Sequence, residues 1–188
     1  MRATTAILAA AALLLPHSAT RADPSSAGEF NAAGYRAARY RAPVTRDPAP
    51  AARLALPAAM LLHPGKDAQF IDVLPAEGGV RDPTTGAWRL AASHVTIAGA
   101  LWHPEAGRGS PDPVLWRGLV AAVRKARRRD PSIPVVLFCR SDCWMGWNAA
   151  KRLASQGFSG VWWLAEGIDG WHDAGGKLVP AIPARVHE

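Results

Sequence analysis

Both cysteines of the chain lie in one short stretch, VVLFCRSDCWMGW at 135–147. Cys139 follows an apolar run, and Cys143 comes four positions later, directly before Trp144. Two neighbouring thiols can form a disulfide, exchange disulfides with another molecule or carry a sulfane sulfur, and the thiolate is the reactive form in each reaction. The pattern leaves a structural disulfide, a redox pair and a persulfide site open.

A disulfide between these two positions is possible only under a geometric condition. Residues four apart in an ideal helix have Cβ atoms about 5–6 Å apart, whereas a disulfide needs about 3.5–4.5 Å. A pair whose first member ends a strand has the freedom to close. Because so short a loop gains little entropic stabilisation from a disulfide, a functional pair is slightly favoured over a purely structural one.

A metal site at the thiols would need further ligands. The histidines that could supply them show no paired spacing: His63, His94, His103 and His172. Structural zinc sites place their ligands in closely spaced pairs. We therefore expect neither a metal nor another cofactor.

The elements that must position the thiols alternate along the chain. Apolar runs typical of short strands occupy 68–75, 133–139 and 159–167, with a further strand or extended segment at 95–104. Apolar residues at helical spacing predict helices at 110–130 and 145–158. This alternation predicts an α/β fold, a parallel sheet with helices on both faces. Sites in such folds form at the carboxyl ends of the strands, where Cys139 lies.

The start of the chain has the three parts of a secretory signal peptide. Arg2 gives a basic start, Ala6–Leu15 are apolar, and small residues precede a cleavage point between Ala22 and Asp23. The apolar run is too short for a spanning helix, which needs about 20 residues. We expect residues 1–22 to be removed and the protein to be periplasmic or secreted, where disulfides persist.

The remaining 166 residues suit one domain. Residues 23–53 are rich in Ala, Pro, Gly and Arg and predict an extended arm, followed by a domain at 54–180 and a tail at 181–188. Within the domain, 56–65 predicts a short helix, and 77–94 has the composition of a loop. A final helical turn is expected from residue 167.

The charge is a modest basic excess. The whole chain carries +7, and removal of two arginines with the signal leaves +5. The densest cluster, RKARRRD at 124–130, ends a predicted helix, where cations suit the helix dipole. We expect no nucleic-acid binding and no membrane span in the mature protein.

Four stretches resemble the rhodanese-like superfamily in order and spacing. They are FIDV (70–73), IAGALWHP (97–104), VVLFCRS (135–141) and AAKRLASQGFSGVWWLAEGIDGW (149–171). The resemblance covers roughly residues 54–172. It implies a central parallel sheet of about five strands, with a cysteine that ends one strand and opens the loop into a helix.

A narrower resemblance rests on three shorter stretches: GYRAARYRAPV, TIAGALW and CWMGWNAAKR. They are similar to exported rhodanese-like proteins of the PQQ-dependent catabolism-associated CXXCW motif family. That resemblance implies an accessory role beside a periplasmic quinoprotein dehydrogenase or its electron-transfer partner.

The resemblance also implies roles for the residues of the loop. Cys139 would be the catalytic nucleophile, and a persulfide on it would be held by backbone N–H groups and favoured by the helix N-terminus. The loop that follows consists of Arg140, Ser141, Asp142 and Trp144, together with the second cysteine.

Two of these side chains depart from the sulfurtransferase pattern. Asp142 stands where glycine is usual, and Trp144 stands where many members have a basic residue. Both changes should weaken the binding of thiosulfate, and Arg140 is the only cation nearby in sequence. Our first hypothesis is an accessory protein with a redox or sulfur-handling Cys pair. The alternative is an active sulfurtransferase with a persulfide on Cys139 and Cys143 as resolving thiol.

Other residues have two interpretations each. Asp72, at a strand end, would support the site by positioning the loop or a substrate, or would cap backbone N–H groups. Trp144 and Trp147 would face a partner or belong to the core. His172 would be a base or a surface residue. The remaining tryptophans singled out are expected in the core: Trp162, Trp163 and Trp171.

Overall fold

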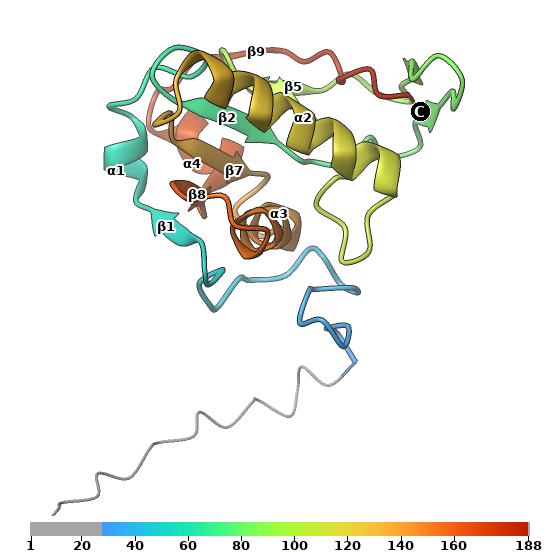
Figure 1. Ribbon diagram of the computed structural model, residues 1–188, viewed down its shortest axis with the longest axis horizontal. Helices are drawn as coiled ribbons and strands as arrows, with labels where there is room; N and C mark the ends of the chain where they lie inside the picture. The colour runs from blue at the N-terminus through green and yellow to red at the C-terminus, as the bar shows by residue number, and fades with distance from the viewer. Residues whose placement is uncertain (1–27, 188) are drawn as a thin grey trace, which may run out of the picture.

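A five-stranded, all-parallel sheet forms the centre of the computed structural model, which describes residues 28–187 (Figure 1). In spatial order its strands are β1 (Ala52–Leu54), β8 (Val161–Leu164), β7 (Val135–Phe138), β2 (Gln69–Asp72) and β6 (Leu101–Trp102). The predicted α/β class and the number of strands are confirmed. The predicted signal peptide lies outside the described residues.

The two central strands of the sheet bring the thiol loop to its carboxyl edge. Every residue of β7 and β2 is buried, as expected for short apolar strands covered on both faces. Their register pairs Asp72 with Phe138. Asp72 and Cys139, the residue after β7, therefore meet at the same end of the sheet.

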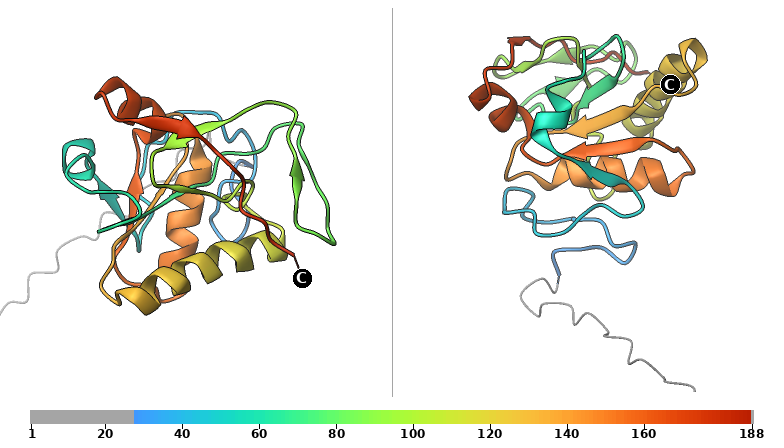
Figure 2. Two further views of the ribbon diagram at one scale, coloured as in Figure 1. Left: turned by 90° about the horizontal axis from the view of Figure 1, so that it is seen from above. Right: turned by 90° about the vertical axis from the view of Figure 1, so that its left-hand side faces the viewer.

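Helices cover both faces of the sheet, as predicted (Figure 2). On one face lie α2 (Pro113–Arg129) and α3 (Trp144–Ser155), and on the other lie α1 (Leu56–Ala59) and α4 (Gly167–Asp173). Alternation along β7 separates the two cores: Leu137 packs with α2 and α3, while Phe138 packs with α1 and α4.

Helix α2 begins and ends at residues whose chemistry suits its ends. The Asp112 carboxylate accepts hydrogen bonds from the backbone N–H groups of Val114 and Leu115, which satisfies donors left free at the helix start. Three arginines occupy its last turn, where the helix dipole favours cations. The helix therefore begins a few residues after the predicted start at 110.

Several short strands were not predicted. The expected loop at 77–94 contains a hairpin of β3 (Val80–Arg81) and β4 (Trp88–Arg89). The expected Pro-rich end of the domain supplies β9 (Leu178–Pro180), which pairs antiparallel with β5 (Val95–Ile97). Strand β1 begins inside the predicted arm. Two- and three-residue strands show no periodicity of their own, since distant partners define them.

Residues 28–51 of the arm form an irregular segment that lies on the domain (Figure 1). Asn148 of α3 fastens it: its Oδ1 accepts from the Arg36 N–H at 2.9 Å and its Nδ2 donates to the Arg36 carbonyl at 2.9 Å. The same Nδ2 also donates to the Gly107 carbonyl at 2.9 Å. This fully buried amide holds the arm against the helix that follows the thiol loop.

Candidate thiol site

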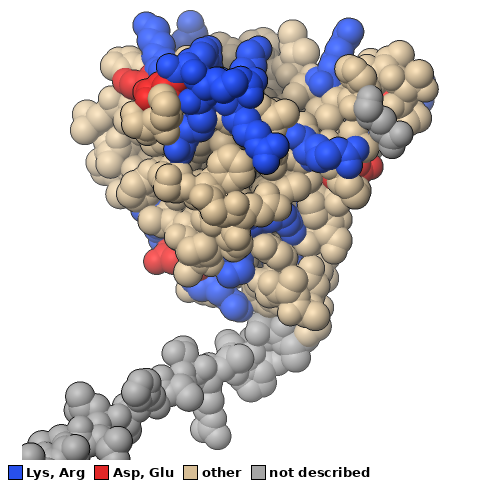
Figure 3. Space-filling model, viewed as in Figure 1, with Lys and Arg blue, Asp and Glu red and all other residues tan. Residues whose placement is uncertain are grey.

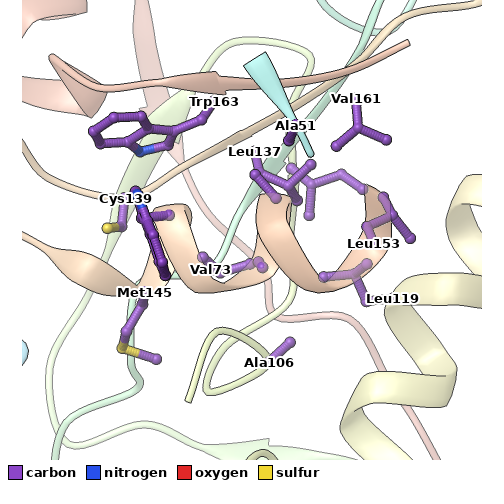
Figure 4. Packing of buried hydrophobic residues seen from close by; sticks show 14 of the residues in the cluster. Ala51, Val73, Ala106, Leu119, Leu137, Cys139, Met145, Leu153, Val161 and Trp163 are labelled. Atoms are coloured by element: carbon purple, nitrogen blue, oxygen red, sulfur yellow. The ribbon is translucent and has the colours of Figure 1, made fainter. Parts of the chain in front are cut away.

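The two thiols lie at the carboxyl end of β7, in the loop that leads into α3. Cys139 directly follows the strand, and Cys143 is the residue before the first turn of the helix. Figure 4 shows Cys139 beside Met145 and Trp163 in the core. Both cysteines are free thiols, and each is only 1% exposed. The architecture thus places the pair where the sequence predicted.

The environment of Cys139 opposes ionisation. Its sulfur lies 2.9 Å from the Cys143 carbonyl oxygen and accepts from the Gly146 N–H at 3.2 Å. Burial raises its pKa well above the usual value, and the hydrogen bond to the Cys143 thiol and the nearby Asp72 act in the same direction. Cys139 is therefore the member of the pair that keeps its proton to the higher pH.

The environment of Cys143 favours the thiolate. The hydrogen bond from Cys139 lowers the pKa of Cys143 most, and the backbone N–H groups of Met145 and Arg140 and the charge of Arg41 lower it further against the cost of burial. A sulfur at a helix N-terminus gains from the same oriented dipoles. The sequence suggested Cys139 as the nucleophile, whereas the electrostatics of the folded pair favour Cys143.

A cavity of about 340 Å³ opens beside Cys143. Its lining is apolar at Leu74, Pro75 and Met145 and charged at its border, where arginines outnumber carboxylates; the polar lining residues are Arg39, Tyr40, Arg41, Glu77 and Arg108. Cys139 does not line this cavity. The thiol with the lowered pKa is therefore also the one adjacent to space for a substrate.

The arm neutralises the acidic residue of the loop. Arg41 makes two hydrogen bonds of 2.9 Å to the Asp142 carboxylate, and its backbone forms a β-bridge with Cys143. Ala42 donates to the Asp142 carbonyl at 2.8 Å. The sequence suggested that Asp142 repels an anionic donor and that Arg140 is the only cation nearby. Arg41, which is distant in sequence, instead forms an ion pair with the Asp142 carboxylate.

The other side of the loop is held by α4. The Asp169 carboxylate accepts from the Ser141 N–H at 3.0 Å and from its hydroxyl at 3.2 Å, and pairs with Arg140 at 3.1 Å. Burial works to raise the pKa of Asp169, but these donors outweigh it and lower the pKa. Arg140 is therefore engaged in fixing the loop. Asp169 was not recognised from the sequence, although it lies in the EGIDGW ending that carries the resemblance.

Asp72 has the capping role suggested by the sequence. It is fully buried, and its Oδ1 caps the Leu74 N–H at 2.8 Å, which fixes the chain at the lip of the cavity. Its Oδ2 accepts from the Thr96 hydroxyl at 2.7 Å and lies 2.8 Å from the His94 Nε2. Asp72 therefore fixes Leu74 at the lip of the cavity and orients His94. The sequence did not indicate the contact between Asp72 and His94.

The interpretation of Trp144 and Trp147 as a partner surface is wrong. Both are 2% exposed, and their rings meet edge to face at 5.3 Å. Phe30 of the arm stacks edge-on against Trp144 at 5.3 Å, and the Trp147 indole donates to the Arg46 carbonyl at 2.8 Å. The arm thus covers the indoles and makes them core.

The other tryptophans singled out from the sequence, and His172, lie in different environments. Trp163 and Trp171 are buried in the two cores, as expected, while Trp162 is half-buried. His172 is exposed and lies 3.6 Å from the neighbouring Asp173. Among residues 28–187 no group of metal-ligating side chains is present.

Comparison with known proteins identifies no relative. No protein-family model matches the chain, and neither a curated protein nor a solved structure resembles it significantly. No helix within the described part of the chain is long and apolar enough to cross a membrane.

Proposed function

We propose that this protein is an exported, rhodanese-like accessory protein whose Cys139–Cys143 pair carries out thiol–disulfide exchange. Export to the periplasm or beyond rests on the signal-peptide pattern of residues 1–22. A role in catabolism that depends on pyrroloquinoline quinone, and a quinoprotein dehydrogenase or its electron-transfer partner as protein partner, rest on the sequence resemblance. The chemistry rests on the geometry of the loop.

The observation that carries the proposal is the inequality of the two thiols. Cys143 has a lowered pKa and lines a cavity, whereas Cys139 has a raised pKa, is enclosed and is hydrogen-bonded to Cys143. Thiol–disulfide exchange needs an accessible thiolate that attacks and a second thiol that resolves the mixed disulfide. Cys143 is itself only 1% exposed, but it borders the cavity and has the lowered pKa, so it is the thiol that a substrate in the cavity would meet first.

The exchange is balanced with a substrate of the general form R–S–S–R. The Cys143 thiolate attacks one substrate sulfur; a bond forms between them, and the other sulfur leaves as a thiolate that takes a proton from water. Cys139 then loses its proton to the second departing thiolate and attacks the Cys143 sulfur. The substrate disulfide is reduced to two thiols, and the pair is oxidised to a disulfide.

The arginines beside Cys143 indicate which substrates would be favoured. Arg39, Arg41 and Arg108 border the cavity with one carboxylate, Glu77, facing them. Each of these arginines has an acidic partner, Arg39 with Glu29, Arg41 with Asp142 and Arg108 with Glu105. The border therefore offers the remaining guanidinium donors to a substrate carboxylate and does not carry a net positive charge. A small disulfide with carboxylates near its sulfurs fits this border better than a neutral or cationic one.

The direct test uses the dianionic aromatic disulfide 5,5′-dithiobis(2-nitrobenzoate) on the fully reduced protein. The wild type should release two aromatic thiolates and retain none, because Cys139 resolves the mixed disulfide. Cys139→Ser should release one and retain the other on Cys143. Cys143→Ser should react at least about 100-fold more slowly, because the remaining thiol is enclosed and protonated.

Two results would contradict the exchange reaction. One is a Cys143→Ser variant that reacts as fast as the wild type, which would return the nucleophile to Cys139. The other is a wild type that retains two aromatic thiolates, which would mean that the thiols never pair. Fractionation of the native host, followed by N-terminal sequencing of the mature chain, tests export separately.

Sulfur transfer is the second candidate, and the three guanidinium groups at the border of the cavity are the observation that favours it. A thiolate would take the outer sulfur of thiosulfate and release sulfite, leaving a persulfide on the protein. The resemblance assigns that persulfide to Cys139, but the cavity lies at Cys143. Mass spectrometry of the reduced protein after incubation with thiosulfate should locate an added sulfur, and no uptake would end this candidate.

A further inference from the structure

A second hollow lies far from the thiol loop, along the outer face of α2. This α2 groove has a volume of about 600 Å³ and runs between the helix and the C-terminal segment. Its cationic residues are Arg117, Lys125, Arg129 and Arg185, and its other lining residues are Gln69, Leu101, His103, Val114, Gly118, Ala121, Ala122, Ala184, Val186 and His187. Figure 3 shows Lys and Arg side chains gathered along this helix.

The groove exists because one face of α2 carries only small side chains. Gly118, Ala121 and Ala122 form the helix side of its floor. A Cβ atom at Gly118 would come within 2.5 Å of the Val186 side chain, so glycine at this position lets the C-terminal segment approach. Val186 is also held by Arg81, which donates to its carbonyl at 2.9 Å. The hollow is thus walled by two fixed segments.

The cations of the groove have no acidic partner within the described residues. Arg117, Lys125, Arg129 and Arg185 take part in none of the ion pairs of residues 28–187, and no carboxylate in that range lines the groove. The loop arginines Arg41 and Arg140, in contrast, are both paired. Cations that converge on a concave surface without neutralisation create a local potential that attracts anions.

A buried imidazole at the floor is the second, independent feature. His103 is 5% exposed and lines the groove. No hydrogen bond to its ring occurs within the described part of the chain, and burial lowers its pKa to about 4. The ring is therefore neutral at physiological pH and offers one unused donor and one unused acceptor. Because His103 lines the groove, these ring nitrogens are available to a ligand that enters it.

We propose that the α2 groove binds a small organic anion that carries carboxylate or phosphate groups on an apolar body. The cations would bind the acidic groups, the alanine, leucine and valine side chains would contact the body, and His103 would hydrogen-bond at the floor. A volume of this size suits a ligand of several hundred daltons. This site does not depend on the proposed thiol chemistry.

A flat acidic surface, such as an anionic membrane, is the competing occupant, and the groove favours the small ligand. A flat surface would contact the cationic rim alone, whereas the hollow and the imidazole at its floor lie out of its reach. The concavity and His103 therefore distinguish a ligand from a membrane.

The test is a calorimetric titration of the full chain with naphthalene-2,6-dicarboxylate at about 0.15 M salt, a physiological ionic strength. The neutral control ligand is naphthalene-2,6-dimethanol, which has the same ring system. Lys125→Glu reverses a charge in the groove, and Arg124→Glu makes the same charge reversal at the neighbouring, exposed residue that does not line it. Both positions are exposed, so neither variant should unfold the helix.

We expect the dicarboxylate to bind and the dimethanol to bind at least about tenfold more weakly. Lys125→Glu should weaken the dicarboxylate about tenfold, and Arg124→Glu by less than about twofold, because a rim charge in water is screened. In NMR spectra the His103 ring resonances should shift on binding, while those of exposed His172 should not.

Three outcomes would overturn the proposal: no binding of the dicarboxylate, equal binding of the neutral ligand, or equal weakening by the two variants. Sedimentation with phosphatidylserine vesicles tests a fourth outcome. If vesicles bind the protein through Lys125 and the dicarboxylate leaves the His103 resonances unmoved, the face is a membrane surface and not a ligand site.

Discussion

The thiol loop and the α2 groove are both rich in arginine, yet they use it differently. In the loop, Arg41 pairs with Asp142 and Arg140 pairs with Asp169, so each cation fixes the backbone that carries the cysteines. In the groove, none of the four cations has an acidic partner in the described chain. Paired charges build a site, whereas unpaired, convergent charges are available to a ligand.

The two regions also differ in the segments that surround them. Two distant segments, the arm and α4, enclose the loop together with the adjoining first turn of α3. Most of the residues that line the groove come from two segments, α2 and the C-terminal segment. Substitutions in the support of the loop should therefore affect stability, and substitutions in the groove should affect binding alone.

Removal of a buried indole beneath the loop should have the largest effect on stability. Trp144→Ala leaves a cavity between Phe30, Trp147 and the sheet, and a buried Trp replaced by Ala costs about 3–5 kcal/mol of unfolding free energy. Arg117→Ala in the groove should change it by less than about 0.5 kcal/mol. Urea unfolding of both variants measures these losses of unfolding free energy. Equal losses would contradict the difference in stability between the two regions.

Loss of the buried amide that fastens the arm should come next. Asn148→Ala leaves the Arg36 N–H and carbonyl and the Gly107 carbonyl without their partner. An unsatisfied buried group costs about 1–3 kcal/mol, so we expect a loss of about 2–4 kcal/mol and faster proteolysis within residues 28–51. Asn148→Asp, which keeps the acceptor but not the donor, should rescue only in part. Unchanged proteolysis would mean that the arm is held by other contacts.

The sequence predicted what depends on local pattern. The buried strand before Cys139, the helix after Cys143 and the long amphipathic helix were all recognisable from apolar spacing. The site was located because parallel sheets gather chemistry at one edge. Strands β1, β3, β4 and β9 were missed. Pairing with a distant partner alone makes residues such as Ala52 and Leu178 extended, and β3 and β4 are two-residue strands of a hairpin, too short to show a periodicity.

The sequence did not predict the electrostatics of the site. The assignment of the nucleophile requires Arg41, the amide of Met145 and the burial of each sulfur, and none of these follows from the spacing of two cysteines. The sequence also left Trp144 open between the core and a partner surface, because its cover, Phe30, lies in a segment with no periodicity.

The difference between the thiols should appear in the pH dependence of alkylation. Iodoacetamide reacts with thiolates, so its rate rises with pH through the pKa and levels off above it. Because the pKa of Cys143 is lowered, its rate should level off at a lower pH than that of a free cysteine. Cys139→Ala removes the largest cause of the lowering and should move the midpoint to higher pH.

The matched control is Cys139→Ser, which retains a hydroxyl donor and should move the midpoint less than Cys139→Ala. Arg41→Gln, which removes a weaker cause, should also produce a smaller upward shift. A midpoint unchanged in Cys139→Ala would show that the helix N-terminus alone sets the pKa of Cys143.

The smallest expected effect is at the ion pair that ties the arm to the loop. Arg41 and Asp142 are 50% and 43% exposed in their side chains, and an exposed pair contributes about 0.2–1 kcal/mol. A double-mutant cycle with Arg41→Gln and Asp142→Asn should give a coupling in this range by urea unfolding. The same variants should nevertheless change the rate at which the protein reacts with 5,5′-dithiobis(2-nitrobenzoate). Because this substrate is an anion, the reaction should be slower for Arg41→Gln and faster for Asp142→Asn. Equal changes of rate in one direction would mean that the pair acts by holding the loop in shape, so that its charges do not act on the substrate.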